Sequence, residues 1–353
     1  MSNPLKKLAG QTMIYGLGTI LPRFLNYFLT PILTYAFSAA LYGINGFLFA
    51  TISFLNIIFT YGMETTFFNF YSKCGPDEER KKQVYNTSLL MLVVSSVLMG
   101  AILIFLSPAI AESLSTPNVT YLPQFIVWCV LIIASDAIMA IPFAKLRSDN
   151  QPIKFSILKI INVVINAGLT VFFVMVCKPA YENNAGNFFS TLYDPQIGIG
   201  YCFLSMVIAN GVTLLLMGKY FASLQFKLNR ELLLQMLKYT WPLIILGLAG
   251  MINETLDRII LKELMIDKEE AQTALGIYSG CYKIAILMTI FIQAFRFAVE
   301  PFFFNQAADK NSKKLYAIVM KYFVIFCSFL FLGTMMNLEW IKYLVDEEYR
   351  RCV

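Results

Sequence analysis

Residues 239–304 read YTWPLIILGLAGMINETLDRIILKELMIDKEEAQTALGIYSGCYKIAILMTIFIQAFRFAVEPFFF. This stretch holds two apolar segments, each long enough to cross a bilayer, and both carry charged side chains. A charge at the centre of a membrane helix costs about 2.5–3.5 kcal/mol on insertion scales, so such side chains face a partner or a water-filled cavity. We therefore expect a polar cavity here, lined by Asn253, Glu254, Asp257, Arg258, Lys283, Arg296 and Glu300.

The whole chain has the composition of a polytopic membrane protein. Of its 353 residues, 58% are hydrophobic and 14% are charged, whereas soluble domains have about 45–50% apolar and about 25% charged residues. The chain has no His, which removes the commonest general base and metal ligand. Its seven Cys are scattered without a C-x-x-C pair, so we expect reduced cysteines that pack within helices. The sequence thus predicts neither an enzyme nor a metal site.

Apolar windows of about 20 residues, the length that spans the hydrocarbon, predict an all-α polytopic membrane fold. We count nine transmembrane helices, at approximately 12–36, 44–70, 84–106, 122–142, 153–177, 198–221, 239–265, 274–304 and 315–338. The loops on one side of the membrane carry 17 Lys and Arg residues, and those on the other side carry 6. The positive-inside rule therefore places the N terminus in the cytoplasm.

A weak internal repeat divides the chain into two halves. The matching pairs are Arg23 with Arg258, Gly43 with Gly276, and Glu64 with Glu300, at offsets of 233 to 236 residues. Repeated halves around a central site are typical of transporters. We assign a six-helix N-terminal lobe to 1–221, a cytoplasmic connecting segment to 222–238, and the first three helices of a C-terminal lobe to 239–353. Because two like lobes would need at least three more helices, we expect a partial sequence.

The connecting segment is basic and amphipathic. It either lies along the inner membrane surface or extends the helix that follows it.

Some of the intramembrane charges can neutralise each other within one helix. Glu254–Arg258 and Arg296–Glu300 have the i, i+4 spacing of ion pairs that brace a helix, and this structural interpretation stays open. The pairs leave five charges unexplained: Arg23, Glu64, Asp136, Asp257 and Lys283. Without partners these would cost on the order of 15 kcal/mol in lipid, which a hydrated cavity avoids. A polar stripe along the fifth predicted helix consists of Ser156, Lys159, Asn162 and Asn166.

Three motifs carry a resemblance to a known family. They are NETLDRIIL at 253–261, LGIYSGCYKI at 275–284 and AVEPFF at 298–303, and they resemble the bacterial polysaccharide flippases of the multidrug/oligosaccharidyl-lipid/polysaccharide exporter superfamily. The resemblance implies a MATE-like fold of two lobes around a cavity that opens alternately to each side of the cytoplasmic membrane. It implies transport of an undecaprenyl-pyrophosphate-linked oligosaccharide to the outer leaflet. The implied partners are this substrate, membrane lipids and other polysaccharide-assembly proteins, without nucleic acid.

The resemblance also assigns roles to the polar residues of the cavity. Basic and amide side chains would bind the pyrophosphate or acidic sugars, and here these are Arg23, Asn253, Arg258, Lys283 and Arg296. Arg suits this role because its planar fork matches phosphate oxygens. No cofactor is implied besides a coupling ion, H⁺ or Na⁺, which needs a carboxylate. The candidates are Glu64, Asp136, Glu254, Asp257 and Glu300.

Three other functions stay open. A cation-coupled multidrug exporter of the same superfamily would favour an acidic or aromatic cavity, but the intramembrane charges divide evenly, five basic against five acidic. A polytopic polysaccharide polymerase or a membrane glycosyltransferase would draw catalytic residues from larger loops than these. A scaffold without transport would not need so many charges inside the membrane.

Overall fold

A computed structural model describes residues 21, 24–25, 27–115, 120–183, 188–222, 229–265, 267, 270–282, 289, 292 and 312–348. The side chains of 253–255, 312–315 and 344 lie outside this description. Within the described ranges every regular element is a helix, as predicted.

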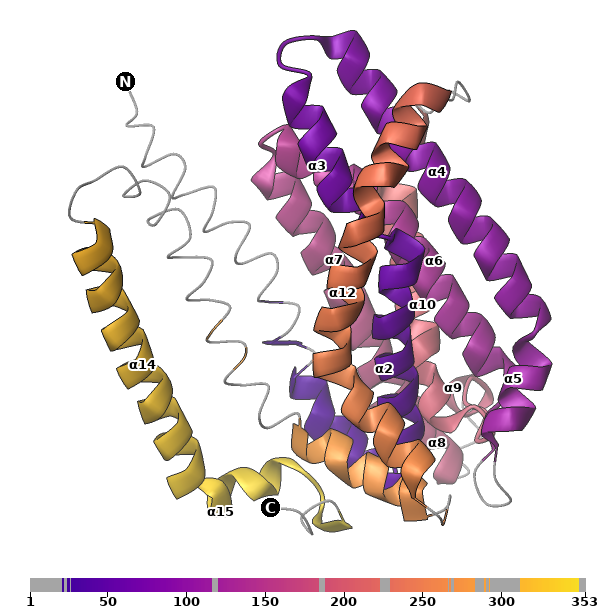
Figure 1. Ribbon diagram of the computed structural model, residues 1–353. Helices are drawn as coiled ribbons and strands as arrows, with labels where there is room; N and C mark the ends of the chain where they lie inside the picture. Colours follow the sequence, from indigo (N-terminus) through magenta and orange to yellow (C-terminus); the bar gives the residue numbers. More distant parts are fainter. Residues whose placement is uncertain are drawn as a thin grey trace.

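The long helices run back and forth between the two ends of a bundle (Figure 1). Their bounds are α2 Ala39–Thr60, α3 Met63–Lys73, α4 Glu78–Phe105, α5 Ser107–Leu114, α6 Pro123–Ser148, α7 Pro152–Val171, α8 Lys178–Glu182, α9 Phe188–Thr191, α10 Tyr201–Leu216, α11 Gly218–Ala222, α12 Arg230–Leu264, α14 Ser312–Met336 and α15 Leu338–Ile341. A π-helical turn at Phe172–Cys177 joins α7 to α8. Residues 27–36 and 270–282 are also helical.

Seven described stretches of helix are long and apolar enough to cross a membrane. They match the second to the seventh and the ninth of the predicted spans. The first predicted span is described over its second half, from about residue 24, and most of the eighth lies outside the described residues. The prediction of a polytopic all-α membrane protein is therefore confirmed.

Local sequence signals set where these helices begin and break. Asn229 caps α12, because its side chain accepts a hydrogen bond from the backbone N–H of Leu232 at 3.1 Å. Between α2 and α3, Tyr61 and Gly62 adopt positive φ angles of 35° and 73°. A Cβ at Gly62 would also press on the Leu243 side chain of α12, so both the backbone and the packing require glycine there.

The predicted connecting segment is described from Asn229 onward. There, 230–238 form the first turns of α12, which continues to Leu264 although Pro242 lies inside it. For these nine residues the structure therefore shows the helix extension, the second of the two interpretations.

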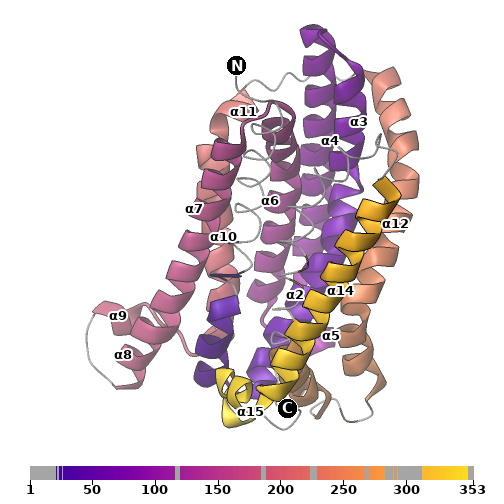
Figure 2. The ribbon, with the colours of Figure 1, turned by 90° about the vertical axis from the view of Figure 1, so that its left-hand side faces the viewer.

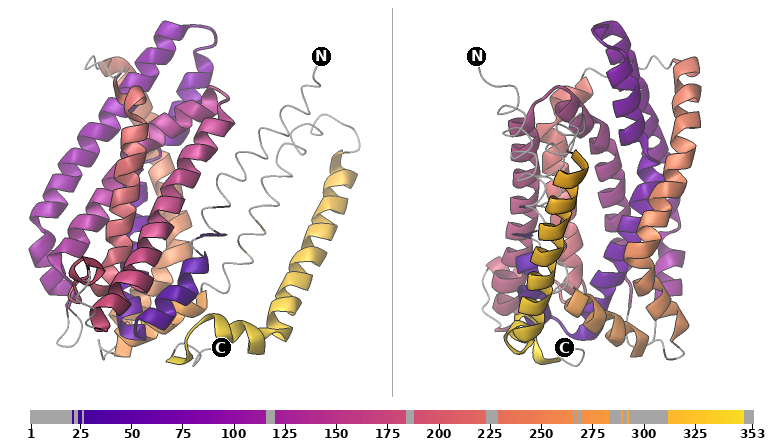
Figure 3. Two further views of the ribbon diagram at one scale, coloured as in Figure 1. Left: turned by 180° about the vertical axis from the view of Figure 1, so that it is seen from behind. Right: turned by 60° about the vertical axis from the view of Figure 1, so that its left-hand side comes forward.

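The main apolar core of the described residues lies between α2, α6 and α10. Its fully buried members include Ile44, Leu48, Ile132 and Phe203, from α2, α6 and α10, each 2% exposed or less. α12 lies along this bundle beside α2 and α3 (Figure 2). α14 stands apart from it over most of its length (Figure 3), and its membrane span has no buried side chain.

The bundle has two chemically different ends. The α3–α4 and α6–α7 turns lie at one end, which we call the basic end because it carries Lys73, Lys81, Lys145 and Arg147. The other end, called the far end, carries α5, α8 and α15. The positive-inside rule predicts that the basic end faces the cytoplasm.

The two predicted lobes meet at the far end, where α2 contacts the helix 270–282. Gly43 and Gly276 face each other there without side chains between the backbones. A Cβ on Gly276 would overlap the carbonyl oxygen of Ala39, and one on Gly43 would overlap that of Gln272. The two contacts are reciprocal, because Ala39 and Gly43 lie 233 residues before Gln272 and Gly276, and Gly46 faces Ser279 at the same separation. Such reciprocal contacts arise when like elements pack about a twofold axis, which supports the predicted repeat.

The cysteines differ from expectation at one position. Cys74, Cys129, Cys177, Cys202 and Cys327 are free, whereas Cys281 forms a disulfide. The prediction of reduced cysteines is wrong there, because the spacing of cysteines along a chain does not show which of them meet in the fold.

Candidate functional site

Asp136 lies in the middle of α6, within a network of buried polar side chains. Asn210 of α10 donates from Nδ2 to Asp136 Oδ1 at 3.0 Å and to Ser135 Oγ at 2.8 Å. Asn162 of α7 donates to Asn210 Oδ1 at 2.9 Å and to Thr213 Oγ1 at 3.0 Å. Asn210 and Thr213 are only 2% and 0% exposed. Because Asn210 uses both its donors and its acceptor, it fixes the position of the Asp136 carboxyl group.

A positive charge accompanies this carboxyl group inside the bundle. Lys159 lies on α7 close enough for its charge to act on Asp136. The ammonium group of Lys159 is 4.3 Å from the centre of the Phe143 ring, a distance typical of a cation–π contact. The predicted polar stripe of α7 therefore contributes Lys159 and Asn162 to the surroundings of Asp136.

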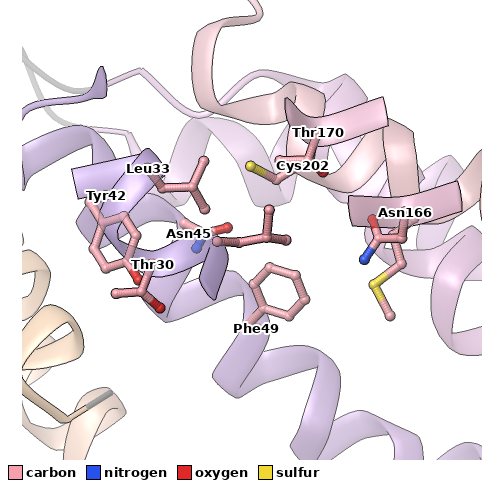
Figure 4. Close-up of a pocket in the computed structure, with 10 residues that line it drawn as sticks. Thr30, Leu33, Tyr42, Asn45, Phe49, Asn166, Thr170 and Cys202 are labelled. Atoms are coloured by element: carbon pink, nitrogen blue, oxygen red, sulfur yellow. The ribbon is translucent and has the colours of Figure 1, made fainter. Parts of the chain in front are cut away.

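A cavity of about 170 Å³ lies between the helix 27–36, α2, α7 and α10 (Figure 4). The amide oxygens of Asn45 and Asn166 are buried at this cavity and have no hydrogen-bond partner among the described groups. Figure 4 shows the two amides on opposite sides of the cavity. At about 30 Å³ per water, the cavity has room for several waters, which would satisfy these oxygens. Asn166 lies one turn from Asn162 on α7, so the cavity adjoins the Asp136 network.

Arg258 brings a cation from α12 to the same region. The central carbon of its guanidinium group is 4.5 Å from the centre of the Tyr282 ring. Its Nε is buried and has no hydrogen-bond partner among the described residues. The charge of Arg258 acts on Tyr42, which lines the 170 Å³ cavity. A partly buried guanidinium with an unused donor is suited to an anionic ligand.

Two other candidate carboxylates lie in different surroundings. Asp257 is exposed and accepts hydrogen bonds from the Tyr278 hydroxyl and, at 2.9 Å, from the backbone N–H of Arg258. Glu64 Oε1 lies 2.7 Å from Arg147 Nη1 at the basic end, where the two side chains are 43% and 47% exposed. Of the three candidate carboxylates whose side chains are described, Asp136 is the one held in the bundle interior.

The remaining predicted residues stay predictions. Arg23, Lys283, Arg296 and Glu300 lie outside the described residues, and so do the side chains of Asn253 and Glu254, although their backbone belongs to α12. The predicted ion pairs Glu254–Arg258 and Arg296–Glu300 therefore have no described geometry. In the part of the chain that the structure describes, no group of three or more Cys, Asp or Glu side chains could hold a metal ion.

Three residues of structural importance were not anticipated. Asn210 and Thr213 are polar residues in an apolar predicted span, which is the signal that could have drawn attention to them. Lys262 lies near the end of the seventh predicted span, yet it is only 5% exposed. Its place at the end of a span gives no sign of burial, since lysines there normally extend into water.

The comparison with known families identifies the chain. A family model described as polysaccharide biosynthesis protein matches residues 8–306. The chain belongs to this family. Among curated protein sequences, none matches it at a significant level.

Solved structures show which fold this polysaccharide biosynthesis protein adopts. A point mutant of the Vibrio cholerae MATE transporter VcmN superposes with a TM-score of 0.64 and 14% identity, over 98% of this chain and 77% of that one. A MATE protein in complex with MaD3S gives 0.61 and 14%, over 98% and 75%. An inward-facing multidrug resistance MATE family transporter of the MOP superfamily gives 0.61 and 14%, over 94% and 75%. The predicted MATE-like fold is confirmed, and at 14% identity the likeness establishes the fold alone.

Proposed function

We propose that this polysaccharide biosynthesis protein is a flippase. It moves an undecaprenyl-pyrophosphate-linked oligosaccharide from the inner to the outer leaflet of the bacterial cytoplasmic membrane by alternating access. Family membership supports a substrate related to polysaccharide, and the MATE-like fold supports transport. The observation that carries the proposal is Arg258, whose partly buried guanidinium group keeps an unpartnered Nε among the described residues.

The chemistry of Arg258 suits a pyrophosphate. A guanidinium group offers donors in a rigid plane that match two phosphate oxygens at once, and it stays charged at any physiological pH. Its contact with the Tyr282 ring holds this plane in place before a ligand arrives. Since the site is partly shielded from water, each charge-assisted hydrogen bond to phosphate is stronger than it would be at the surface.

Asp136 is the carboxylate that we assign to ion coupling. Transport against a gradient needs a group that changes its charge or its ion during the cycle. Asp136 is fixed by Asn210 and lies near Lys159, so binding or loss of H⁺ or Na⁺ would alter the charge balance of α6, α7 and α10 together. The adjoining cavity gives water and ions room beside this network.

The deciding experiment measures transport by the full-length chain in proteoliposomes that contain a fluorescent undecaprenyl-pyrophosphate oligosaccharide. We expect Arg258→Ala to abolish movement of the labelled lipid between leaflets, with Arg258→Lys intermediate because it keeps the charge and loses the planar fork. Arg230→Ala is the matched control, since Arg230 is an exposed arginine at the start of the same helix. This control should transport normally.

The same proposal predicts that Arg258→Ala and Arg23→Ala each stop surface-polysaccharide export in cells while the protein still reaches the membrane. Normal export with both residues replaced would remove them from the substrate path. Transport of cationic drugs without any movement of the lipid-linked oligosaccharide would replace the flippase by the multidrug exporter.

A further inference from the structure

Among the described residues, the hydrogen bonds between the two predicted lobes lie at the far end. Lys262 of α12 donates from Nζ to the Tyr121 hydroxyl oxygen at 3.2 Å. Tyr121 in turn donates to Gln272 Oε1 at 3.2 Å, and Gln272 Nε2 donates to the carbonyl oxygen of Ala40 at 3.4 Å. These three bonds join α12 and the helix 270–282 to α2 and to Tyr121, which lies just before α6.

Lys262 is the unusual member of this group. Lysine is among the residue types least often buried, yet this one is 5% exposed. Its Nζ lies 3.8 Å from the centre of the Phe47 ring and 4.4 Å from that of Tyr121, close enough for a cation–π contact with each. Burial raises the pKa of the Tyr121 phenol, so this hydroxyl stays neutral and can accept from Lys262 while it donates to Gln272. We call Lys262, Phe47, Tyr121 and Gln272 the Lys262 latch.

A second contact between distant parts of the chain lies at the same end. Glu348 Oε2 accepts a hydrogen bond from the backbone N–H of Ala39, at the start of α2, at 3.0 Å. The Tyr35 hydroxyl donates to the carbonyl oxygen of Tyr343 at 3.0 Å. Val345 is 1% exposed and belongs to the main apolar core. The segment after α14 therefore also contacts the far end of the N-terminal lobe, through hydrogen bonds and apolar packing.

The basic end is organised differently. A cavity of about 640 Å³ lies there, lined by Phe68 and Ser72 of α3 and by Tyr239 of α12 among others. Contacts between α12 and the N-terminal lobe at this end are apolar, such as the edge-on packing of Phe70 and Tyr239, whose ring centres are 6.1 Å apart. Among the described residues, polar contacts therefore close the far end, whereas the basic end has apolar contacts beside a cavity that is open to the surface.

We propose that the Lys262 latch holds the far end closed and sets the balance between this conformation and one that is open there. When the lobes separate, Lys262 must leave the two ring faces, Tyr121 must release Gln272, and Gly43 must part from Gly276. Removing the lysine therefore favours the conformation open at the far end. The proposal rests on the proposed function only in that the lobes alternate, and it does not depend on which substrate is carried.

The test reads the accessibility of one cysteine at each end of the full-length chain in sealed membrane vesicles of both orientations. Ser279→Cys reports the far end, because Ser279 is 4% exposed against α2. Ser72→Cys reports the 640 Å³ cavity at the basic end. Each is labelled with a membrane-impermeant maleimide, and the reporter peptide is quantified by mass spectrometry so that the native cysteines remain in place. No oligosaccharide is added.

We expect Lys262→Met to raise the labelling rate of the Ser279→Cys reporter about tenfold, the change that a shift of about 1.4 kcal/mol produces. Labelling of the Ser72→Cys reporter should fall in the same variant. Phe47→Leu should act in the same direction and add little to Lys262→Met, since both remove the same contact. Lys342→Met is the matched control, because it removes a charge at the same end outside the latch, and it should change neither rate.

Unchanged rates in Lys262→Met would overturn the proposal. A rise at both reporters would also overturn it. That pattern indicates loosened packing of the whole protein rather than a shift from the conformation closed at the far end to the one open there. These outcomes are independent of the flippase assignment, which fails only if the oligosaccharide is not transported.

Discussion

Gly43 and Gly276, 233 residues apart in the sequence, pack backbone against backbone where the two predicted lobes meet. Neither position has space for a methyl group, because a Cβ atom there would overlap a carbonyl oxygen of the facing helix. The contact is reciprocal, since Gly276 lies against Ala39 and Gly43 lies against Gln272, so this approach of the predicted lobes follows the predicted repeat. This contact lies beside the Lys262 latch, and both must separate when the far end opens.

Gly276→Ala is expected to destabilise the protein. The added methyl group collides with the backbone of α2, and overpacking of this kind costs about 1–3 kcal/mol. Gly250→Ala is the control on the neighbouring helix α12, since nothing lies within 4 Å of its Cβ position. That change should be neutral or raise stability by up to about 1 kcal/mol through helix propensity. Thermal unfolding of the purified full-length protein in detergent measures both, and equal effects would contradict the close approach.

Asp136→Asn is expected to uncouple transport from the ion gradient. The asparagine keeps an oxygen that can accept from Asn210, so the network retains its shape while the titratable charge disappears. Transport driven by an imposed H⁺ or Na⁺ gradient should fall at least about tenfold, which corresponds to about 1.4 kcal/mol. Glu112→Gln, at an exposed position of α5, should leave it unchanged. Full gradient-driven transport by Asp136→Asn would assign coupling to another carboxylate.

Glu64→Gln is expected to have little effect on either transport or stability. The ion pair with Arg147 is nearly half exposed on both sides, and pairs of this kind contribute about 0.2–1 kcal/mol. The small loss should shrink further at high salt, because exposed charges are screened. The measurement is thermal unfolding at low and high ionic strength beside the transport assay. A loss of transport with normal stability would return Glu64 to the list of coupling residues.

Asn210→Leu is expected to lower the free energy of unfolding through the groups that it leaves behind. Without the amide, Asp136 loses a donor and Asn162 loses an acceptor, and each buried unsatisfied group costs about 1–3 kcal/mol. Asn337→Ala serves as the comparison, since Asn337 is exposed after α14 and surface changes of this kind stay within about 0.5 kcal/mol. Comparable unfolding temperatures for the two variants would show that the Asp136 network is not tightly packed.

Much of the fold could be predicted from the sequence. Hydropathy located each of the seven described spans, because a run of about twenty apolar residues is typical of a helix that crosses a membrane. Basic and non-basic loops alternate along the sequence, which predicted that the basic loops lie at the same end of the bundle. The α3–α4 and α6–α7 turns do lie together at the basic end. The repeat pairs Gly43 with Gly276, and these two residues are in contact in the structure.

The site was predicted less completely, because hydropathy reveals that a polar residue is in a span but not which neighbour it meets. Glu64, Asp136 and Asp257 were equivalent candidates on that measure. The structure separates them, with Glu64 paired at the surface, Asp257 exposed beside Tyr278, and Asp136 held by Asn210.

The sequence by itself determined that this chain is a multi-pass helical membrane protein, and it predicted two related lobes with charges inside the bilayer. Only the tertiary structure decided which of these charges are paired, buried or available. The physical reason is distance along the chain: Asp136 meets Asn210 across 74 residues, Glu64 meets Arg147 across 83, and Lys262 meets Tyr121 across 141. Contacts of this kind depend on how helices rotate and pack against each other, which no local pattern of residues records.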